Sequence, residues 1–156
     1  MAKKLSSKID FSSEYTLIGI SCHLKDYRLT FFLNNKLHLH LSRIDDFVQE
    51  GPDKKDLSYS VYFYQCLETQ NNFCLISNHH SDGKLIPTLG SIDYFLLIEN
   101  EIPNERKKEL IKAIKTIPNV LTAYELDLAK VKNIHQLLAE LELQFIENKN
   151  EKKTLD

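Results

Sequence analysis

The chain has 156 residues, of which 42% are hydrophobic and 27% charged, and this length and composition predict one globular domain with its own core. A formal net charge of -2 gives no overall signal for nucleic-acid binding, so an anionic polymer would have to meet a local basic patch. Three cysteines without a C-x-x-C pair argue against a disulfide framework and against a zinc knuckle.

The N-terminal residues and the apolar runs predict a cytoplasmic protein. The first eight residues carry lysines with no apolar segment behind them, so they do not resemble a signal peptide. The longest apolar run, Phe95 to Ile98, is far too short to cross a bilayer. We therefore expect a cytoplasmic location and no membrane contact.

The first half of the chain predicts a strand, a helix and a second strand. Residues 15–21 form a short apolar run typical of a buried strand. An amphipathic helix follows, with Ser21 as its N-cap and Asn34-Asn35 as its stop signal. Alternating Leu and His over residues 37–41 indicate a half-buried strand. The apolar stripe of the helix is predicted at i, i+3, i+4, i+7 and i+8, which are Leu24, Tyr27, Arg28, Phe31 and Phe32.

The second half predicts a hairpin, a central strand and two helices separated by a strand. Residues 57–67 and 73–77 alternate and are expected to pair through a turn. Residues 92–99 are apolar on both faces, as in a central strand. A helix over 103–117 and a strand over 120–128 follow. A last helix, capped by Asn133, is predicted to bury Ile134, Leu137, Leu138, Leu141 and Phe145.

This element order predicts the α+β class. We expect a two-layer sandwich with a mixed or antiparallel sheet and with helices mainly on one face. The order is ferredoxin-like or ACT-like, and an analogy at this level carries no function. One domain is expected over residues 1–146, ordered from about residue 12, and residues 147–156 are predicted to be a charged, disordered tail.

Three segments resemble one known family. Ile86-Pro87 followed by Ile92-Asp93-Tyr94 is similar to the signature of the IPExxxVDY family, small proteins of Bacteroidetes-type bacteria. Residues 19–29 and 117–125 are similar to other parts of that family, so the resemblance covers most of the chain between residues 15 and 128. Thr88 stands where the family motif has glutamate, which removes a carboxylate there. Because the family has no assigned function, the resemblance implies no catalytic or binding residues.

Asp93 and Tyr94 open the predicted central strand just after a turn and form the first candidate site. In a functional site, Asp93 would be an acid or an anion and Tyr94 a hydroxyl donor. In an architectural role, Asp93 would accept backbone or arginine hydrogen bonds while Tyr94 packs in the core. Arg28 lies on the predicted apolar stripe, so it either reaches solvent or pairs with a buried acid. We hypothesise that Arg28 pairs with Asp93.

Lys108, Lys112 and Lys115 share one face of a predicted helix, at i, i+4 and i+7. They form the best local cationic patch of the chain and are candidate phosphate contacts. Glu105 and Glu109 interleave with them, which is also typical of a solvated helix face. RNA is therefore an alternative partner, and DNA is not expected.

Histidines and cysteines do not specify a metal site or a catalytic pair. His38 and His40 stand at i and i+2, with His79-His80 in a loop, but nothing specifies a third ligand, so we expect no metal. Cys66 and Cys74 lie on opposite arms of the predicted hairpin and are expected to be free thiols in a reducing cytoplasm. The sequence has no glycine-rich phosphate loop, serine nucleophile elbow or paired-carboxylate motif. We expect no catalytic residue and no cofactor.

These patterns favour a non-enzymatic interaction or regulatory module that binds a protein partner or a second copy of the chain. An RNA-associated factor that uses the Lys108–Lys115 helix face is the alternative. An enzyme with a site near Asp93 comes third, because it would need a pocket around Arg28, Asp93 and Tyr94.

Overall fold

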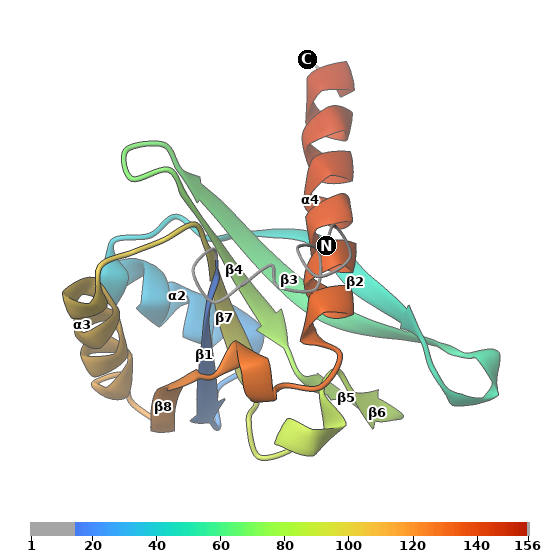
Figure 1. Cartoon of the computed structure of the whole chain (residues 1–156), viewed down its shortest axis with the longest axis horizontal. Helices are drawn as coiled ribbons and strands as arrows, with labels where there is room; N and C mark the ends of the chain where they lie inside the picture. Colours follow the sequence, from blue (N-terminus) through green and yellow to red (C-terminus); the bar gives the residue numbers. More distant parts are fainter. Residues whose placement is uncertain (1–14, 156) are drawn as a thin grey trace, which may run out of the picture.

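A six-stranded antiparallel sheet forms the centre of the computed structural model, which describes the backbone of residues 15–155 and side chains as far as Phe145 (Figure 1). Three helices and several short turns surround the sheet. In chain order the elements are β1 Tyr15–Cys22, α2 Asp26–Leu37, β2 Ser42–Glu50, a 3-10 turn Pro52–Lys54, β3 Asp56–Cys66, β4 Asn71–Ser77, β5 His79–His80, β6 Gly83–Lys84, a 3-10 turn Pro87–Leu89, β7 Tyr94–Glu99, α3 Asn104–Lys115, β8 Val120–Leu126, a 3-10 turn Leu128–Lys130 and α4 Ile134–Leu155.

The six strands lie in the order β2-β3-β4-β7-β1-β8. The unit β7-α3-β8 encloses β1, whereas α2 leads from β1 to the edge strand β2, and the chain returns through β3 to β4 beside β7. β1 and β4 run parallel with β7 between them, and β7 and β8 run parallel with β1 between them. This arrangement is ferredoxin-like, and β2 and β3 extend it beyond β4. The predicted α+β sandwich with an antiparallel sheet is confirmed. The helices do not form a single second layer, because α2 and α3 cover one face of the sheet and α4 covers the other.

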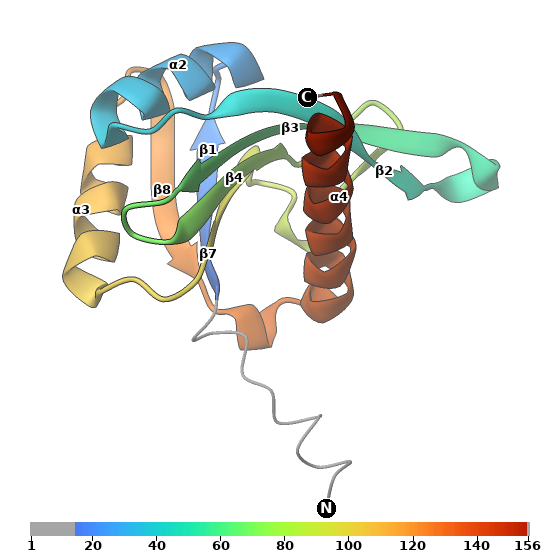
Figure 2. The ribbon, with the colours of Figure 1, turned by 90° about the horizontal axis from the view of Figure 1, so that it is seen from above.

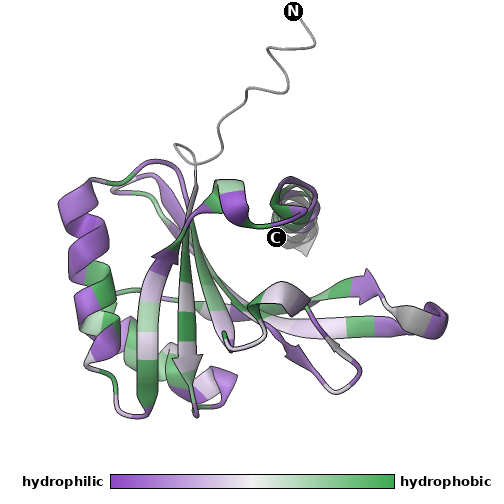
Figure 3. Cartoon of the chain, turned by 60° about the horizontal axis from the view of Figure 1, so that its bottom comes forward, coloured by the Kyte–Doolittle hydropathy of each residue, from purple (hydrophilic) through white to green (hydrophobic). Residues whose placement is uncertain are grey.

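The sheet carries an apolar core on each face (Figure 2). α2 and α3 cover one face, where Leu96 of β7 shares a buried cluster with Leu33 and Leu110. α4 lies over the other face, where Leu138 shares a cluster with Phe95 of β7. Neighbouring strand residues point to opposite faces, so Phe95 and Leu96 belong to different cores. The central strands are accordingly hydrophobic over much of their length (Figure 3).

Helix α2 turns a different face to the sheet than the predicted stripe. Its buried residues are Leu29, Thr30, Leu33 and Leu37, whereas Tyr27 and Phe31 are 59% and 61% exposed. The prediction is wrong because apolar residues lie all around this helix, and periodicity alone selected the outward set. Ser21 is not the N-cap either, since it belongs to β1 and its hydroxyl donates to the Ser91 carbonyl at 2.7 Å.

The strand predicted over residues 37–41 is also wrong. Leu37 ends α2, and His38 follows in the left-handed conformation with φ 56°. The side chain of Asn34 holds the connection, because its amide donates to the Leu41 carbonyl at 3.1 Å and its Oδ1 accepts from the Leu41 amide at 2.9 Å. The alternation of Leu and His therefore marks a packed connection rather than a strand.

The edge strand β2 has no counterpart in the predicted elements. It is a charged strand in which Phe47 alone is buried, and a bulge interrupts its pairing with β3 between Ile44 and Phe47. Without a regular apolar alternation such a strand gives little periodic signal. A bulge and charged side chains are also what protects an exposed sheet edge from aggregation.

The last helix buries the face predicted for it, with Ile134, Leu138, Leu141 and Phe145 in the core. α4 continues to Leu155, so residues 147–155, which were predicted to be a disordered tail, are helical here. Glu and Lys have high helix propensity, which permits this continuation. The predicted start of order, near residue 12, lies outside the described residues. Among the described helices, none is both long enough and apolar enough to span a membrane.

Candidate binding pocket

Asp93 and Tyr94 join the start of β7 to the residues that follow β1. Asp93 accepts a hydrogen bond from the Cys22 amide at 2.8 Å through Oδ2, and its Oδ1 contacts Nε2 of His79. The hydroxyl of Tyr94 donates to the Leu24 carbonyl at 2.8 Å, and burial raises the pKa of this phenol well above its ordinary value. These contacts match the architectural role, in which Asp93 holds backbone and Tyr94 packs in the core.

The hypothesis that Arg28 pairs with Asp93 is wrong. Arg28 lies on the exposed side of α2, with its guanidinium carbon 5.9 Å from the centre of the Phe32 ring. Within residues 15–155 no ion pair joins it to Asp93, because Arg28 faces solvent whereas Asp93 sits at the end of a sheet strand. Neither Arg28 nor Asp93 lines any of the four best-formed cavities of the described residues, which have volumes of about 300 to 830 Å³.

Asn78 and Ile92 fix the loop over residues 86–92, which carries part of the family resemblance, against the sheet. Asn78 is fully buried, and its amide donates to the carbonyls of Leu89 at 3.1 Å and Ile92 at 2.8 Å. Its Oδ1 accepts from the Ile86 amide at 2.8 Å. Ile92 in turn packs on β1 so closely that a Cβ at Gly19 would lie 2.6 Å from its Cδ1. Asn78 and Ile92 therefore hold this loop against the sheet and serve the fold.

The predicted lysine patch lies on the outer side of α3. Lys108, Lys112 and Lys115 are all exposed, and within residues 15–155 none of the three forms an ion pair. Two neighbouring cations are engaged, since Lys107 pairs with Glu125 of β8 at 3.2 Å and Arg106 pairs with Glu109 at 3.7 Å. The sequence placed these lysines on one face correctly.

The two predicted histidine pairs lie at different places in the fold. His38 and His40 follow α2, whereas His79 contacts Asp93 and the ring of His80 lies 6.2 Å from that of Tyr59. In the part of the chain that the structure describes, no group of three or more His, Cys, Asp or Glu side chains is placed to hold a metal ion.

The two hairpin cysteines lie on opposite faces of the sheet. Cys66 packs at the edge of the core beneath α2 and α3, and Cys74 belongs to the core beneath α4. Their strand partners are Asn71 and Phe63, so the two thiols are not cross-strand neighbours. All three cysteines of the chain are free.

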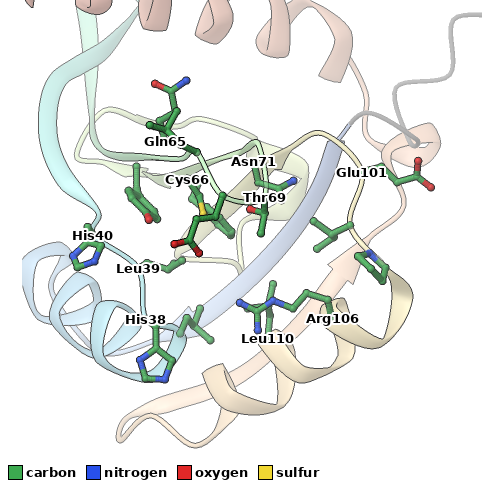
Figure 4. Close-up of a pocket in the computed structure, with 17 residues that line it drawn as sticks. His38, Leu39, His40, Gln65, Cys66, Thr69, Asn71, Glu101, Arg106 and Leu110 are labelled. Carbon is green, nitrogen blue, oxygen red and sulfur yellow. The ribbon is translucent and has the colours of Figure 1, made fainter.

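A pocket of about 830 Å³ lies between the end of α2, the turn that joins β3 to β4, and the first turn of α3 (Figure 4). Three turns of the chain build it: His38 and Gln70 adopt the left-handed conformation, and Pro103 precedes α3. The buried apolar side chains that line it are Leu37, Leu39, Phe73, Ile102 and Leu110, and the buried polar one is Asn71. The exposed side chains on its rim are His38, His40, Gln65, Leu67, Glu68, Thr69, Glu101, Pro103 and Arg106.

Aromatic and polar contacts hold the walls of this pocket in place. The Tyr64 ring lies between its neighbours, 5.4 Å from His40 in an edge arrangement and 6.1 Å from Phe73 in a stacked one. The side-chain amide of Asn71 donates to the carbonyls of Glu99 at 3.0 Å and Asn100 at 3.1 Å, which ties β4 to the end of β7. A ligand would therefore meet walls that are already ordered.

Cys66 is a thiol in the pocket lining whose pKa is shifted by its neighbours. Hydrogen bonding from the side chain and backbone of Thr69 lowers the pKa of the Cys66 thiol below its ordinary value. Within residues 15–155 no hydrogen bond joins Cys66 to His38 or His40, so the described contacts contain no thiol–imidazole pair of the kind that activates a nucleophile.

Sequence reasoning did not find this pocket, because its lining comes from three segments far apart in the chain. Two features of the sequence belong to this pocket: the alternation of Leu and His after α2, and Leu67 in the β3–β4 turn. They lie too far apart in the chain to indicate one site. No known protein family, no curated protein and no solved structure matches this chain, so the resemblance to the IPExxxVDY family stays a prediction.

Proposed function

We propose that the chain is a non-enzymatic binding module of the cytoplasm that receives an apolar side chain of a protein partner in the pocket between α2, α3 and the β3–β4 turn. The observation that carries the proposal is the combination of a buried apolar lining with Leu67 on the rim, 78% exposed. A large aliphatic side chain left in solvent beside an apolar pocket gains free energy when a partner covers both.

The rim favours a peptide segment as the occupant. Glu68 lies in the β3–β4 turn, Glu101 in the connection from β7 to α3, and Arg106 in the first turn of α3. A segment with an apolar anchor residue and flanking charges of both signs would complement this rim, while the anchor fills the apolar lining. Buried apolar anchors with a polar surround are the usual anatomy of a protein interface.

The described side chains support binding rather than catalysis. In this pocket the Cys66 thiol contacts Thr69 and Tyr64, and the His40 ring contacts Tyr64. Asp93 and Tyr94, the other polar candidates, make hydrogen bonds to backbone groups at the end of β1.

Two measurements test the proposal. Peptides selected from a phage-displayed random library on the immobilised protein should share an apolar anchor residue. Nile red, an uncharged dye, should gain fluorescence on binding the protein. Cys66→Phe places a ring in the pocket and should weaken both interactions at least tenfold, whereas Val48→Phe adds a ring on the exposed edge strand and should weaken neither.

Equal binding to the Cys66→Phe and Val48→Phe proteins would contradict the proposal. The same conclusion would follow if Nile red showed no fluorescence gain with the unmodified protein. Near-ultraviolet circular dichroism of each variant separates a filled pocket from an unfolded protein.

A further inference from the structure

The helix layer formed by α2 and α3 has a net positive charge, although the chain as a whole has a net negative charge. The two helices contain seven basic and three acidic residues, whereas the chain contains 20 basic and 22 acidic residues. The remaining residues of the chain therefore carry more acidic than basic side chains. Such a local field attracts an anionic polymer even when the net charge is negative.

The cations of this layer differ in how freely they can bind. Lys107 and Arg106 form ion pairs with Glu125 and Glu109. Lys108, Lys112 and Lys115 are exposed and form no ion pair within residues 15–155, and they follow one face of α3 over about 10 Å at the rise of an α-helix. The outer side of α3 is largely hydrophilic in Figure 3.

Helix α2 adds exposed aromatic rings to the same layer. Tyr27 and Phe31, one helical turn apart, are 59% and 61% exposed, and Arg28 lies exposed between them in sequence. Asp26 is the one acidic residue of this helix, and it is engaged by Arg43 at 3.5 Å. α2 and α3 cover the same face of the sheet (Figure 2), and both the rings and the lysines are exposed on these two helices.

We propose that the outer surface of α2 and α3 binds single-stranded RNA. The lysines of α3 would contact phosphates, and Tyr27 and Phe31 would stack on unpaired bases. Exposed rings beside a basic row are the combination that holds single strands, because stacking needs bases that are not already paired. An acidic protein would use the lysines alone. An anionic membrane surface also accepts exposed rings beside lysines, so the vesicle measurement below separates it from RNA.

The test measures the fluorescence anisotropy of a labelled 12-nucleotide oligouridine against increasing salt. The Lys108→Glu, Lys112→Glu, Lys115→Glu protein should bind at least tenfold more weakly, and the slope of log affinity against log salt should fall by about 2, for three lost phosphate contacts. Tyr27→Ala with Phe31→Ala removes two stacking rings, so it should lower affinity at least about thirtyfold and leave that slope unchanged. The Cys66→Phe pocket variant should bind RNA normally.

The matched control makes the same charge change at three exposed lysines outside α2 and α3, as Lys54→Glu, Lys55→Glu, Lys132→Glu. Its affinity for the oligouridine should fall less than threefold. Absence of binding at low salt would overturn the inference. So would an equal loss in the control, equal affinity for a 12-base-pair duplex, or equal affinity for poly-aspartate or phosphatidylglycerol vesicles.

Discussion

Asn78 provides the sharpest test of how the motif loop is held. The substitution Asn78→Ala removes three side-chain hydrogen bonds from a fully buried site, two donated to the carbonyls of Leu89 and Ile92 and one accepted from the Ile86 amide. A hydrogen bond contributes about 1 kcal/mol net, so the free energy of unfolding should fall by about 3 kcal/mol. That is a large share of the stability of a typical domain.

Urea unfolding followed by circular dichroism measures the loss. With a slope of about 2 kcal/mol/M, the midpoint should fall by about 1.5 M. Asn35→Ala, an exposed asparagine of α2, is the matched control and should change the midpoint little. A difference of less than roughly 0.5 M between the urea midpoints of the Asn78→Ala and Asn35→Ala proteins would refute the role assigned to Asn78.

Three further predictions follow from the same contacts. Gly19→Ala should lower the free energy of unfolding in urea by about 2 kcal/mol, because the added Cβ would meet Cδ1 of Ile92. Adding Ile92→Val removes that methyl group and should recover part of the lost stability. An equal loss with and without Ile92→Val would contradict this. Tyr94→Phe should cost about 1 kcal/mol by losing the bond to the Leu24 carbonyl, and an unchanged midpoint would count against it. Thiolate is the reactive form, so iodoacetamide should modify Cys66 in the native protein, and Thr69→Val should raise its pKa and move the pH profile of the rate upward. Faster modification of the buried Cys74, whose pKa burial raises, would be the contrary result.

Much of the fold could be predicted because most strands and two of the helices follow simple apolar periods. The central strand is apolar on both faces, and the β3–β4 hairpin alternates regularly, so both were found. The face of α2 could not be predicted, since Tyr27 and Phe31 fit a helical stripe as well as the buried Leu29 and Leu33 do. Only the position of the sheet decides between the two sets.

The candidate pocket was beyond sequence reasoning for a different reason. Its lining joins residues from the end of α2, the β3–β4 turn and the start of α3, and those meet only after the strands have paired. The Asp93-Tyr94 motif drew attention instead, because polar residues at a strand start are visible in one short segment. Its contacts with the Cys22 amide and the Leu24 carbonyl depend on a strand about seventy residues away.

The central claim is that the pocket between α2, α3 and the β3–β4 turn is the binding site. Titration of the isotope-labelled protein with a selected peptide, followed by backbone amide shifts, tests it most directly. We predict that the largest shifts fall at Leu39, Cys66 and Arg106, and that Cys66→Phe abolishes them. Shifts centred on β8 or α4, or shifts that persist in the Cys66→Phe protein, would contradict the claim.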